Sequence, residues 1–187
     1  MIVAGVDEVG RGALFGPLVA AAVAYEEGCV PQGVKDSKVL SQRKRESLYG
    51  EILHSAKDVS VSMATSFRID EINVHNADKG ALREALLGLR VPVERAFVDG
   101  FPLEGLPFPH EAVFHGDASI PVISAASIVA KVLRDHLMAL FSVHFPLYGL
   151  DVNKGYGTTS HREAVKTHGP TLFHRTSFHI KSLGEKL

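Results

Sequence analysis

The sequence is poor in cysteine, with Cys29 as the only one among 187 residues. A single cysteine excludes an intramolecular disulfide framework and cysteine-based zinc clusters, and it fits a reducing cytoplasm. The ten histidines do not change this conclusion, because the sequence contains no His-Glu-x-x-His or His-x-His pair. We therefore expect a cytoplasmic protein without a structural zinc site.

Long apolar runs are also missing. The longest nearly uncharged stretch near the start, residues 13–25, contains Gly16 and Pro17 and is too short to span a bilayer. Asp7 and Glu8 interrupt the beginning of the chain, so a secretory signal is not expected. With 187 residues and a hydrophobic fraction of 45%, the chain can bury one substantial core. We expect a soluble protein with no membrane partner and a single domain over residues 1–187.

Signatures of several enzyme classes are absent as well. The sequence has no Walker phosphate loop, no Gly-x-Gly-x-x-Gly after a strand and no Gly-x-Ser-x-Gly elbow. Acyl transfer and nicotinamide chemistry therefore have no support. No internal repeat or low-complexity tract is visible either.

The net charge of −1 gives no sign of a polyanionic partner, but the charges are unevenly distributed. Residues 35–45 carry five Lys or Arg against one Asp, residues 46–151 carry eight against fourteen Asp or Glu, and residues 152–187 carry six against two. Two basic segments around an acidic one could form a groove for a phosphate backbone and a metal. Ordinary solvated faces explain the same pattern more simply.

The most informative stretch runs from Val3 to Gly16. Residues 2–6 are apolar and β-branched and predict a central strand, and Asp7 and Glu8 follow where that strand should emerge. Adjacent carboxylates at a strand end are costly unless they are solvated or meet a cation such as a divalent metal. Taken alone, a solvated turn is the simpler explanation.

The loop that follows has a different composition. Gly10 and Gly12 remove side chains on both sides of Arg11, so backbone N–H groups can approach a ligand closely. The guanidinium of Arg11 offers a planar fork to a phosphate. A tight bend without function remains the alternative.

The rest of the chain predicts strands alternating with helices. Strands or extended segments are expected over residues 17–25, antiparallel to the first strand, and over 58–67, 95–98 and 112–114. Helices are expected from a Ser41 cap to about 56, over about 69–89 with Gly80 as a weak point, over 124–145, and over about 162–168 behind a Ser160/Glu163 capping box.

Two further carboxylates follow short predicted strands. Asp99 comes directly after residues 95–98, and Asp117 comes shortly after residues 112–114. If these ends converge on Asp7 and Glu8, the four carboxylates form an all-oxygen cage suited to two magnesium or manganese ions. Such a pair of ions can drive in-line phosphodiester cleavage.

A second glycine-rich cluster covers residues 153–161. Gly155 and Gly157 flank Tyr156 and should leave its ring exposed, which suits stacking on a base or sugar. Packing within the protein is an equally good explanation.

The ordered set of these motifs closely resembles bacterial ribonuclease HII, the type 2 ribonuclease H family, through most of the chain. The matching pieces are Asp-Glu-Val-Gly-Arg-Gly at 7–12, Asp-Ser-Lys at 36–38, Asp99-Gly100, Gly116-Asp117, Ser-Ala-Ala-Ser-Ile-Val-Ala-Lys at 124–131 with Arg134-Asp135, Lys-Gly-Tyr-Gly-Thr at 154–158, and His174-Arg175 before Ser177-Phe178. The resemblance implies an α/β, ribonuclease-H-like fold with a mixed central sheet flanked by helices, and a helical carboxyl-terminal segment. It also implies two-metal endonucleolytic cleavage of RNA in RNA/DNA hybrids and 5′ to ribonucleotides embedded in duplex DNA, leaving 3′-hydroxyl and 5′-phosphate ends.

The resemblance also implies roles for individual residues. Asp7, Glu8, Asp99 and Asp117 would be the catalytic carboxylates and would bind two Mg²⁺ or Mn²⁺ ions. The substrate would be bound by Gly10, Arg11 and Gly12 at the ribonucleotide, by Tyr156 at the deoxyribose after the RNA-to-DNA junction, and by Lys38 and Lys154 at phosphates. The substrate-contacting carboxyl-terminal segment would cover about 150–187, and the enzyme is expected to be a monomer.

Three alternatives remain at this point. The type 3 enzyme shares part of the opening motif, but it carries an additional amino-terminal substrate-binding domain, so type 2 is favoured. An actin-like phosphotransferase also begins with a strand that delivers an aspartate into a glycine loop, although this length leaves little room for a second nucleotide-binding half. A hybrid-binding protein without catalysis would keep the groove, but it would have no need of all four carboxylates.

Overall fold

The computed structural model of the protein describes residues 1–34, 37, 39–180 and 185–186. Its strands are β1 (Ile2–Val9), β2 (Leu18–Glu26), β3 (Asp58–Ala64), β4 (Arg95–Asp99), β5 (His110–Val113), β6 (His179–Ile180) and β7 (Glu185–Lys186). Its helices are α1 (Gln42–Ser55), α2 (Ser66–Ile72), α3 (Val74–Leu87), α4 (Gly116–Ser119), α5 (Pro121–His144), α6 (Leu150–Asn153) and α7 (Thr159–His168), with a 3₁₀ turn at Pro146–Tyr148.

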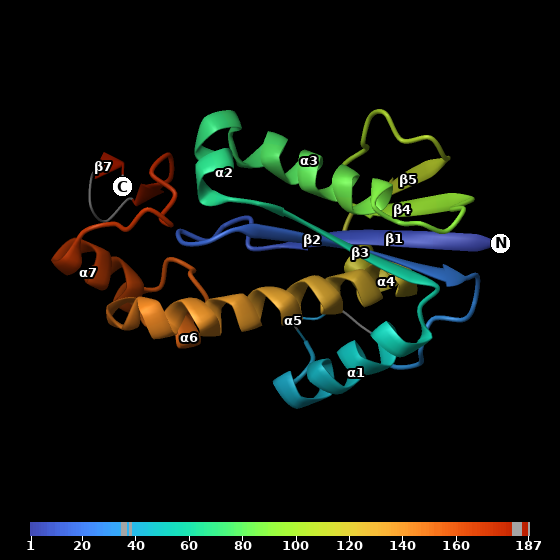
Figure 1. Ribbon diagram of the computed structural model, residues 1–187, viewed down its shortest axis with the longest axis horizontal. Coiled ribbons are helices and arrows are strands. Elements are labelled where there is room, and N and C mark those ends of the chain that lie inside the picture. The colour runs from blue at the N-terminus through green and yellow to red at the C-terminus, as the bar shows by residue number, and fades with distance from the viewer. Residues whose placement is uncertain (35–36, 38, 181–184, 187) are drawn as a thin grey trace.

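The centre of the fold is a five-stranded mixed sheet in the order β3-β2-β1-β4-β5. Strand β1 pairs antiparallel with β2 and parallel with β4, which in turn pairs parallel with β5. Helices α2 and α3 cover one face of this sheet, and α5 and α1 lie on the other (Figure 1). The predicted mixed sheet with flanking helices, and the antiparallel pairing of the first two strands, are confirmed. No helix among the described residues is long and apolar enough to cross a membrane.

Each face of the sheet has its own apolar core. On the α3 side, β1 and β2 pack small residues such as Ala4 and Ala20 against Leu82 and Leu86. On the α5 side, Gly5 allows the closest approach, because a side chain there would overlap the backbone of Val122. Helix α5 therefore lies directly on β1, the strand that carries Asp7 and Glu8.

The long helix expected over residues 69–89 is two helices, and the expected weak point was wrong. The break falls at Asn73, which has a positive φ of 66°, whereas Gly80 lies inside α3. The Asn73 side chain also accepts a hydrogen bond from the backbone N–H of Asn76 at 3.0 Å. Asparagine tolerates positive φ and caps helices, so it both ends α2 and starts α3.

Some other predicted boundaries need correction. Helix α7 begins at Thr159 and is capped by Thr158, whose side chain accepts the N–H of His161 at 3.2 Å. The predicted Ser160/Glu163 capping box was therefore wrong. Strand β1 runs to Val9, so Asp7 and Glu8 lie inside the strand, and β3 ends at Ala64.

The carboxyl-terminal region contains helices α6 and α7, as expected, followed by the small β6-β7 sheet. A separate apolar cluster fixes this region to the end of α5. It joins Phe15, in the loop after β1, to Met138, Tyr148, Leu150 and Val165. The carboxyl-terminal segment is thereby placed beside the glycine loop.

Candidate active site

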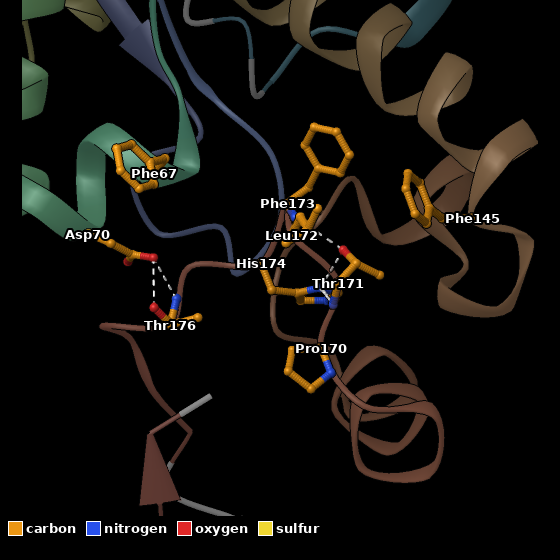
Figure 2. Close-up of a pocket in the computed structure, with 9 residues that line it drawn as sticks. All are labelled: Phe67, Asp70, Phe145, Pro170, Thr171, Leu172, Phe173, His174 and Thr176. Atoms are coloured by element: carbon orange, nitrogen blue, oxygen red, sulfur yellow. Dashed lines mark hydrogen bonds between the residues drawn. The ribbon is translucent and has the colours of Figure 1, made fainter.

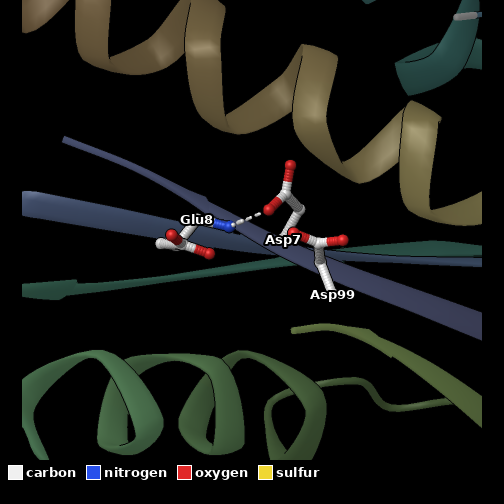
Figure 3. Close-up of side chains that lie close together, drawn as sticks. All are labelled: Asp7, Glu8 and Asp99. Atoms are coloured by element: carbon white, nitrogen blue, oxygen red, sulfur yellow. Dashed lines mark hydrogen bonds between the residues drawn. The ribbon is translucent and has the colours of Figure 1, made fainter. Parts of the chain in front are cut away.

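Three carboxylates from two neighbouring strands meet at the centre of the sheet. Asp7 and Glu8 come from β1, and Asp99 is the last residue of β4, which lies parallel beside β1. Each offers one carboxylate oxygen to a group whose three atoms lie within 4.8 Å of one another. Figure 3 shows the three side chains grouped between α5 and α3. The sequence-based expectation that these residues converge is met for this group.

Burial and mutual repulsion alter the acidity of this group. Burial raises the pKa of Asp7 well above its usual value, and the neighbouring charges of Glu8 and Asp99 raise it further. The pKa of Glu8 is also raised, by burial first and then by Asp99. Oxygen ligands at this spacing suit a hard divalent cation, whose charge would offset the repulsion. The donor set therefore fits the expected metal.

Asp117 lies next to the group rather than in it. Gly116 donates its N–H to Asp99 Oδ1 at 2.6 Å, and Asp117 donates its own N–H to the same oxygen at 3.4 Å. Asp117 is buried, and it belongs to the short helix α4, not to the end of a strand. Among the described residues, the group within 4.8 Å consists of Asp7, Glu8 and Asp99.

The glycine loop follows β1 directly. Gly10 is buried with a φ of 92°, and a side chain there would overlap the guanidinium of Arg134. A glycine is therefore required here because the Arg134 side chain packs against the backbone of residue 10. The sequence alone does not show this contact. Gly12 is exposed, with open space where a side chain would be, as expected for a residue that a ligand approaches.

Two fully buried arginines fix the loop, and sequence reasoning did not recognise them as parts of the site. Arg134 donates hydrogen bonds to the carbonyls of Phe15, Pro17 and Lys154 at 3.1, 2.9 and 2.8 Å. Arg175 donates to the carbonyl of Arg11 at 2.8 Å and twice to that of Gly16, at 2.9 and 3.2 Å. Their presence in the family motifs was the available signal.

Burial disfavours the charge of both guanidinium groups. It lowers the pKa of Arg134, and it lowers that of Arg175 to about 9, to which the neighbouring Arg134 contributes. Hydrogen bonds to backbone carbonyls compensate for the lost water. The two side chains thus hold the loop in one conformation.

Tyr156 lies beside this loop. Leu14 and Phe15 donate backbone hydrogen bonds to the carbonyl of Gly155 at 2.8 and 3.2 Å. The Tyr156 ring is half-buried with the Arg134 guanidinium 5.2 Å from its centre, so it is less exposed than expected. The structure therefore brings together Tyr156 and the glycine loop, which lie far apart in the sequence.

Of the two lysines expected at phosphates, Lys154 lies among the residues that the structure describes. Lys154 is half-buried with a positive φ of 53°, and its carbonyl, not its side chain, accepts the bond from Arg134. Lys38 lies outside the described residues.

A pair of buried histidines, His161 and His174, lies next to the backbone of Tyr156. His161 Nδ1–H donates to the carbonyl of Tyr156 at 2.9 Å, while His174 Nδ1 accepts the N–H of Thr171 at 2.9 Å. These partners leave the His174 Nε2–H to donate to His161 Nε2 at 3.3 Å. Both rings are therefore neutral. Burial, and then His161, lowers the pKa of His174 to about 4.

An open pocket of about 650 Å³ lies next to this pair, between α2, the end of α5 and the segment around residue 172. Asp70 on α2 accepts the N–H and hydroxyl of Thr176 at 2.8 and 2.9 Å (Figure 2). It accepts two similar hydrogen bonds from Ser177. Asp70 thus anchors the carboxyl-terminal segment to the helix layer that carries α3.

Comparison with known proteins agrees with the fold and the motifs. The family model described as Ribonuclease HII matches residues 4–181. The ribonuclease HII of Xanthobacter autotrophicus is 50% identical over 178 residues, which cover 94% of this chain and 70% of that protein. The crystal structure of ribonuclease H2 from Pyrococcus horikoshii OT3 superposes with a TM-score of 0.82 at 29% identity, covering 96% of this chain and 94% of that one. A structure of the complex of PCNA with ribonuclease HII from Archaeoglobus fulgidus gives a TM-score of 0.81 at 29% identity, with 96% of each chain covered. The chain therefore belongs to the ribonuclease HII family.

Proposed function

We propose that this ribonuclease hydrolyses the RNA strand of RNA/DNA hybrids and cuts 5′ to ribonucleotides embedded in duplex DNA, leaving 3′-hydroxyl and 5′-phosphate ends. The observation that carries the proposal is the convergence of Asp7, Glu8 and Asp99 within 4.8 Å, directly before the glycine loop. Membership of the ribonuclease HII family supports the same reaction.

In this proposal the carboxylates of Asp7, Glu8, Asp99 and Asp117 hold two divalent cations, Mg²⁺ or Mn²⁺. Such ions, when bound, activate a water and stabilise the leaving oxygen. Asp99 is fixed by the N–H groups of Gly116 and Asp117, so its second carboxylate oxygen keeps a defined direction. The close packing of α5 on β1 holds Asp7 and Glu8 in place.

We propose that the substrate lies across the glycine loop and Tyr156. Gly12 leaves room for a ribose to approach the backbone, where the 2′-hydroxyl distinguishes RNA from DNA. Arg11 is positioned for a phosphate, and the accessible part of the Tyr156 ring for the deoxyribose after the junction. Gly10 keeps Arg134 close to the loop. Lys38 and Lys154 are proposed phosphate contacts.

We further propose a single-domain monomer that works in the cytoplasm. The sole cysteine, Cys29, is exposed and unpaired, which fits a reducing compartment. The Archaeoglobus fulgidus relative was solved in complex with PCNA, a sliding clamp. Light scattering of the purified chain, alone and with a sliding clamp, therefore tests whether the chain is a monomer.

The reaction is tested with a labelled DNA duplex that contains one ribonucleotide, incubated with Mg²⁺, Mn²⁺ or a chelator. We expect metal-dependent cutting 5′ to the ribonucleotide, no cutting of an all-DNA duplex, and loss of activity in Asp99→Asn. Binding without cutting under every metal condition would instead indicate a hybrid-binding protein without catalysis.

A further inference from the structure

Asp78 is a buried acidic residue that the reaction described above does not use. It lies on α3, its side chain is 1% exposed, and neither of its carboxylate oxygens accepts a hydrogen bond from any residue that the structure describes. Its Oδ2 atom lies 3.4 Å from Arg11 Nη1, an ion pair whose geometry is not that of a hydrogen bond. A buried carboxylate without hydrogen bonds destabilises a fold, so its presence here calls for a function.

A second contact of the Arg11 guanidinium is with an aromatic ring. Its Cζ atom lies 5.0 Å from the centre of the Phe101 ring, and that ring meets the His75 ring edge-on at 4.9 Å. His75 and Asp78 are three residues apart on α3 and therefore share one face of the helix. We call Asp78, Phe101 and His75 the arginine clamp.

The clamp connects Arg11 to the carboxylate group. Phe101 follows Asp99 by two residues, at the turn that ends β4. Arg11 follows Glu8 by three residues, and its side chain remains 38% exposed despite the ion pair and the ring contact. The clamp thus contacts the guanidinium, while the Arg11 side chain as a whole stays partly exposed.

We propose that Asp78 is a positioning residue for substrate binding, which holds the Arg11 guanidinium on the Phe101 ring in the orientation that meets the substrate backbone. This inference rests on the proposed role of Arg11 in binding the substrate. An arginine between two glycines loses much conformational freedom when it binds a phosphate, and a clamp that orders it beforehand reduces this loss.

The charge of Asp78 alone has the opposite effect, since an anion near the site repels phosphates. The two effects can be separated, because repulsion by the charge acts whether or not Arg11 is present, whereas positioning acts only through Arg11. A double-mutant cycle makes this distinction.

The experiment compares the wild type with Asp78→Asn, Arg11→Ala and the double variant, at saturating Mg²⁺, on a duplex with one ribonucleotide. We expect Asp78→Asn to raise KM about 3- to 10-fold and to change kcat less than about 2-fold, because positioning is lost but the carboxylate group is intact. In the Arg11→Ala background, the same substitution should no longer raise KM, because only the relief of repulsion remains, and this leaves KM equal or slightly lower. Glu84→Gln, on the exposed part of the same helix, is the matched control and should behave as the wild type.

Phe101→Leu tests the clamp from its other side and does not depend on the folding of the Asp78 variants. It should raise KM in the same direction, about 2- to 5-fold, through the lost cation–π contact. A KM unchanged in both Asp78→Asn and Phe101→Leu would overturn the proposal. A rise in KM on Asp78→Asn that persists in the Arg11→Ala background would also overturn it, because Asp78 would then act without Arg11. If Arg11→Ala alone leaves KM unchanged while cleavage continues, Arg11 does not bind the substrate. The positioning role of Asp78 is then overturned, whereas the proposed reaction is not.

Discussion

The buried arginines and the buried carboxylates of this protein are satisfied in different ways. Each guanidinium, of Arg134 and of Arg175, donates three hydrogen bonds to backbone carbonyls and lies over an aromatic ring. The carboxylates of Asp7 and Glu8 instead have raised pKa values, because they are withdrawn from water and placed near other negative charges. The arginines complete the framework of the loop, whereas the carboxylates form a site that favours the arrival of positive charge.

The comparison explains why the two kinds of residue should respond differently to substitution. Removing a framework arginine leaves several buried carbonyls without partners, which costs stability. Removing one of several carboxylates that repel one another relieves this repulsion, so the substitution should lower activity without lowering stability. Activity and thermal stability, measured together, therefore distinguish the two regions.

The largest expected effect is on the carboxylate group. Asp99→Asn should reduce the cleavage rate by at least about 1,000-fold, because a charged ligand of the proposed metal site is lost. Its melting temperature in chelator should equal or exceed that of the wild type. A melting temperature lowered by several degrees would contradict the view that Asp99 is a functional, not a structural, residue.

The second effect concerns the framework. Arg134→Met should lower the free energy of unfolding by about 2–4 kcal/mol, because three carbonyls lose their buried donor. Denaturant unfolding measures this change, with Lys166→Met on the exposed surface of α7 as the control. A variant as stable as the wild type would show that the carbonyls find other partners and that Arg134 does not complete the framework.

Gly10 lies between the carboxylates and the buried arginines, and its substitution should cause a smaller loss of stability than Arg134→Met. A side chain at this position would have a positive φ and would overlap the guanidinium of Arg134. Gly10→Ala should therefore lower stability by about 1–3 kcal/mol and displace the loop that carries Arg11. Gly12→Ala, at an open position, is the matched control: it should keep the wild-type melting temperature and weaken substrate binding. Equal melting temperatures for both variants would contradict the close approach of Arg134.

The smallest expected effect is a pH dependence with opposite signs in the two regions. The raised pKa values of Asp7 and Glu8 mean that the folded protein retains protons on them, so their contribution to stability is lost as pH rises above the usual carboxyl range. The pKa of His174, lowered to about 4, has the reverse effect, since its contribution is lost as pH falls from about 6.5 toward 4.

Melting curves in chelator between pH 4 and pH 8 measure both contributions. The stability advantage of Asp7→Asn over the wild type should grow with rising pH, and Mg²⁺ should remove it. His174→Gln should show a weaker loss of stability below pH 6.5 than the wild type. An advantage of Asp7→Asn that stays constant with pH would contradict the raised pKa of Asp7.

Much of this site could be predicted from local sequence. The apolar run before Asp7 predicted β1, the short run before Asp99 predicted β4, and Ser41 predicted the start of α1, whose Lys44 N–H it accepts at 3.3 Å. These features depend on neighbours in the chain. The convergence of Asp7, Glu8 and Asp99, which the sequence offered only as a condition, is brought about in the structure by the parallel pairing of β1 and β4.

What could not be predicted depends on contacts between distant residues. Arg134 lies on α5 and entered the sequence analysis only as part of a family motif, yet it reaches carbonyls more than a hundred positions away. The place of Asp78 beside Arg11 likewise has no local signal, because it arises from the packing of α3 across β1.

The most direct test of the central claim is calorimetric titration of Mn²⁺ into the wild type, Asp99→Asn and Arg134→Met at pH 7.5, with each variant shown to be folded. The claim is that the carboxylates of Asp7, Glu8 and Asp99 form a site for divalent cations, whereas the buried arginines are complete within the protein. We expect Mn²⁺ binding in the wild type, loss or at least about 10-fold weakening in Asp99→Asn, and retained binding in Arg134→Met. Equal Mn²⁺ affinity in the wild type and Asp99→Asn would contradict the account.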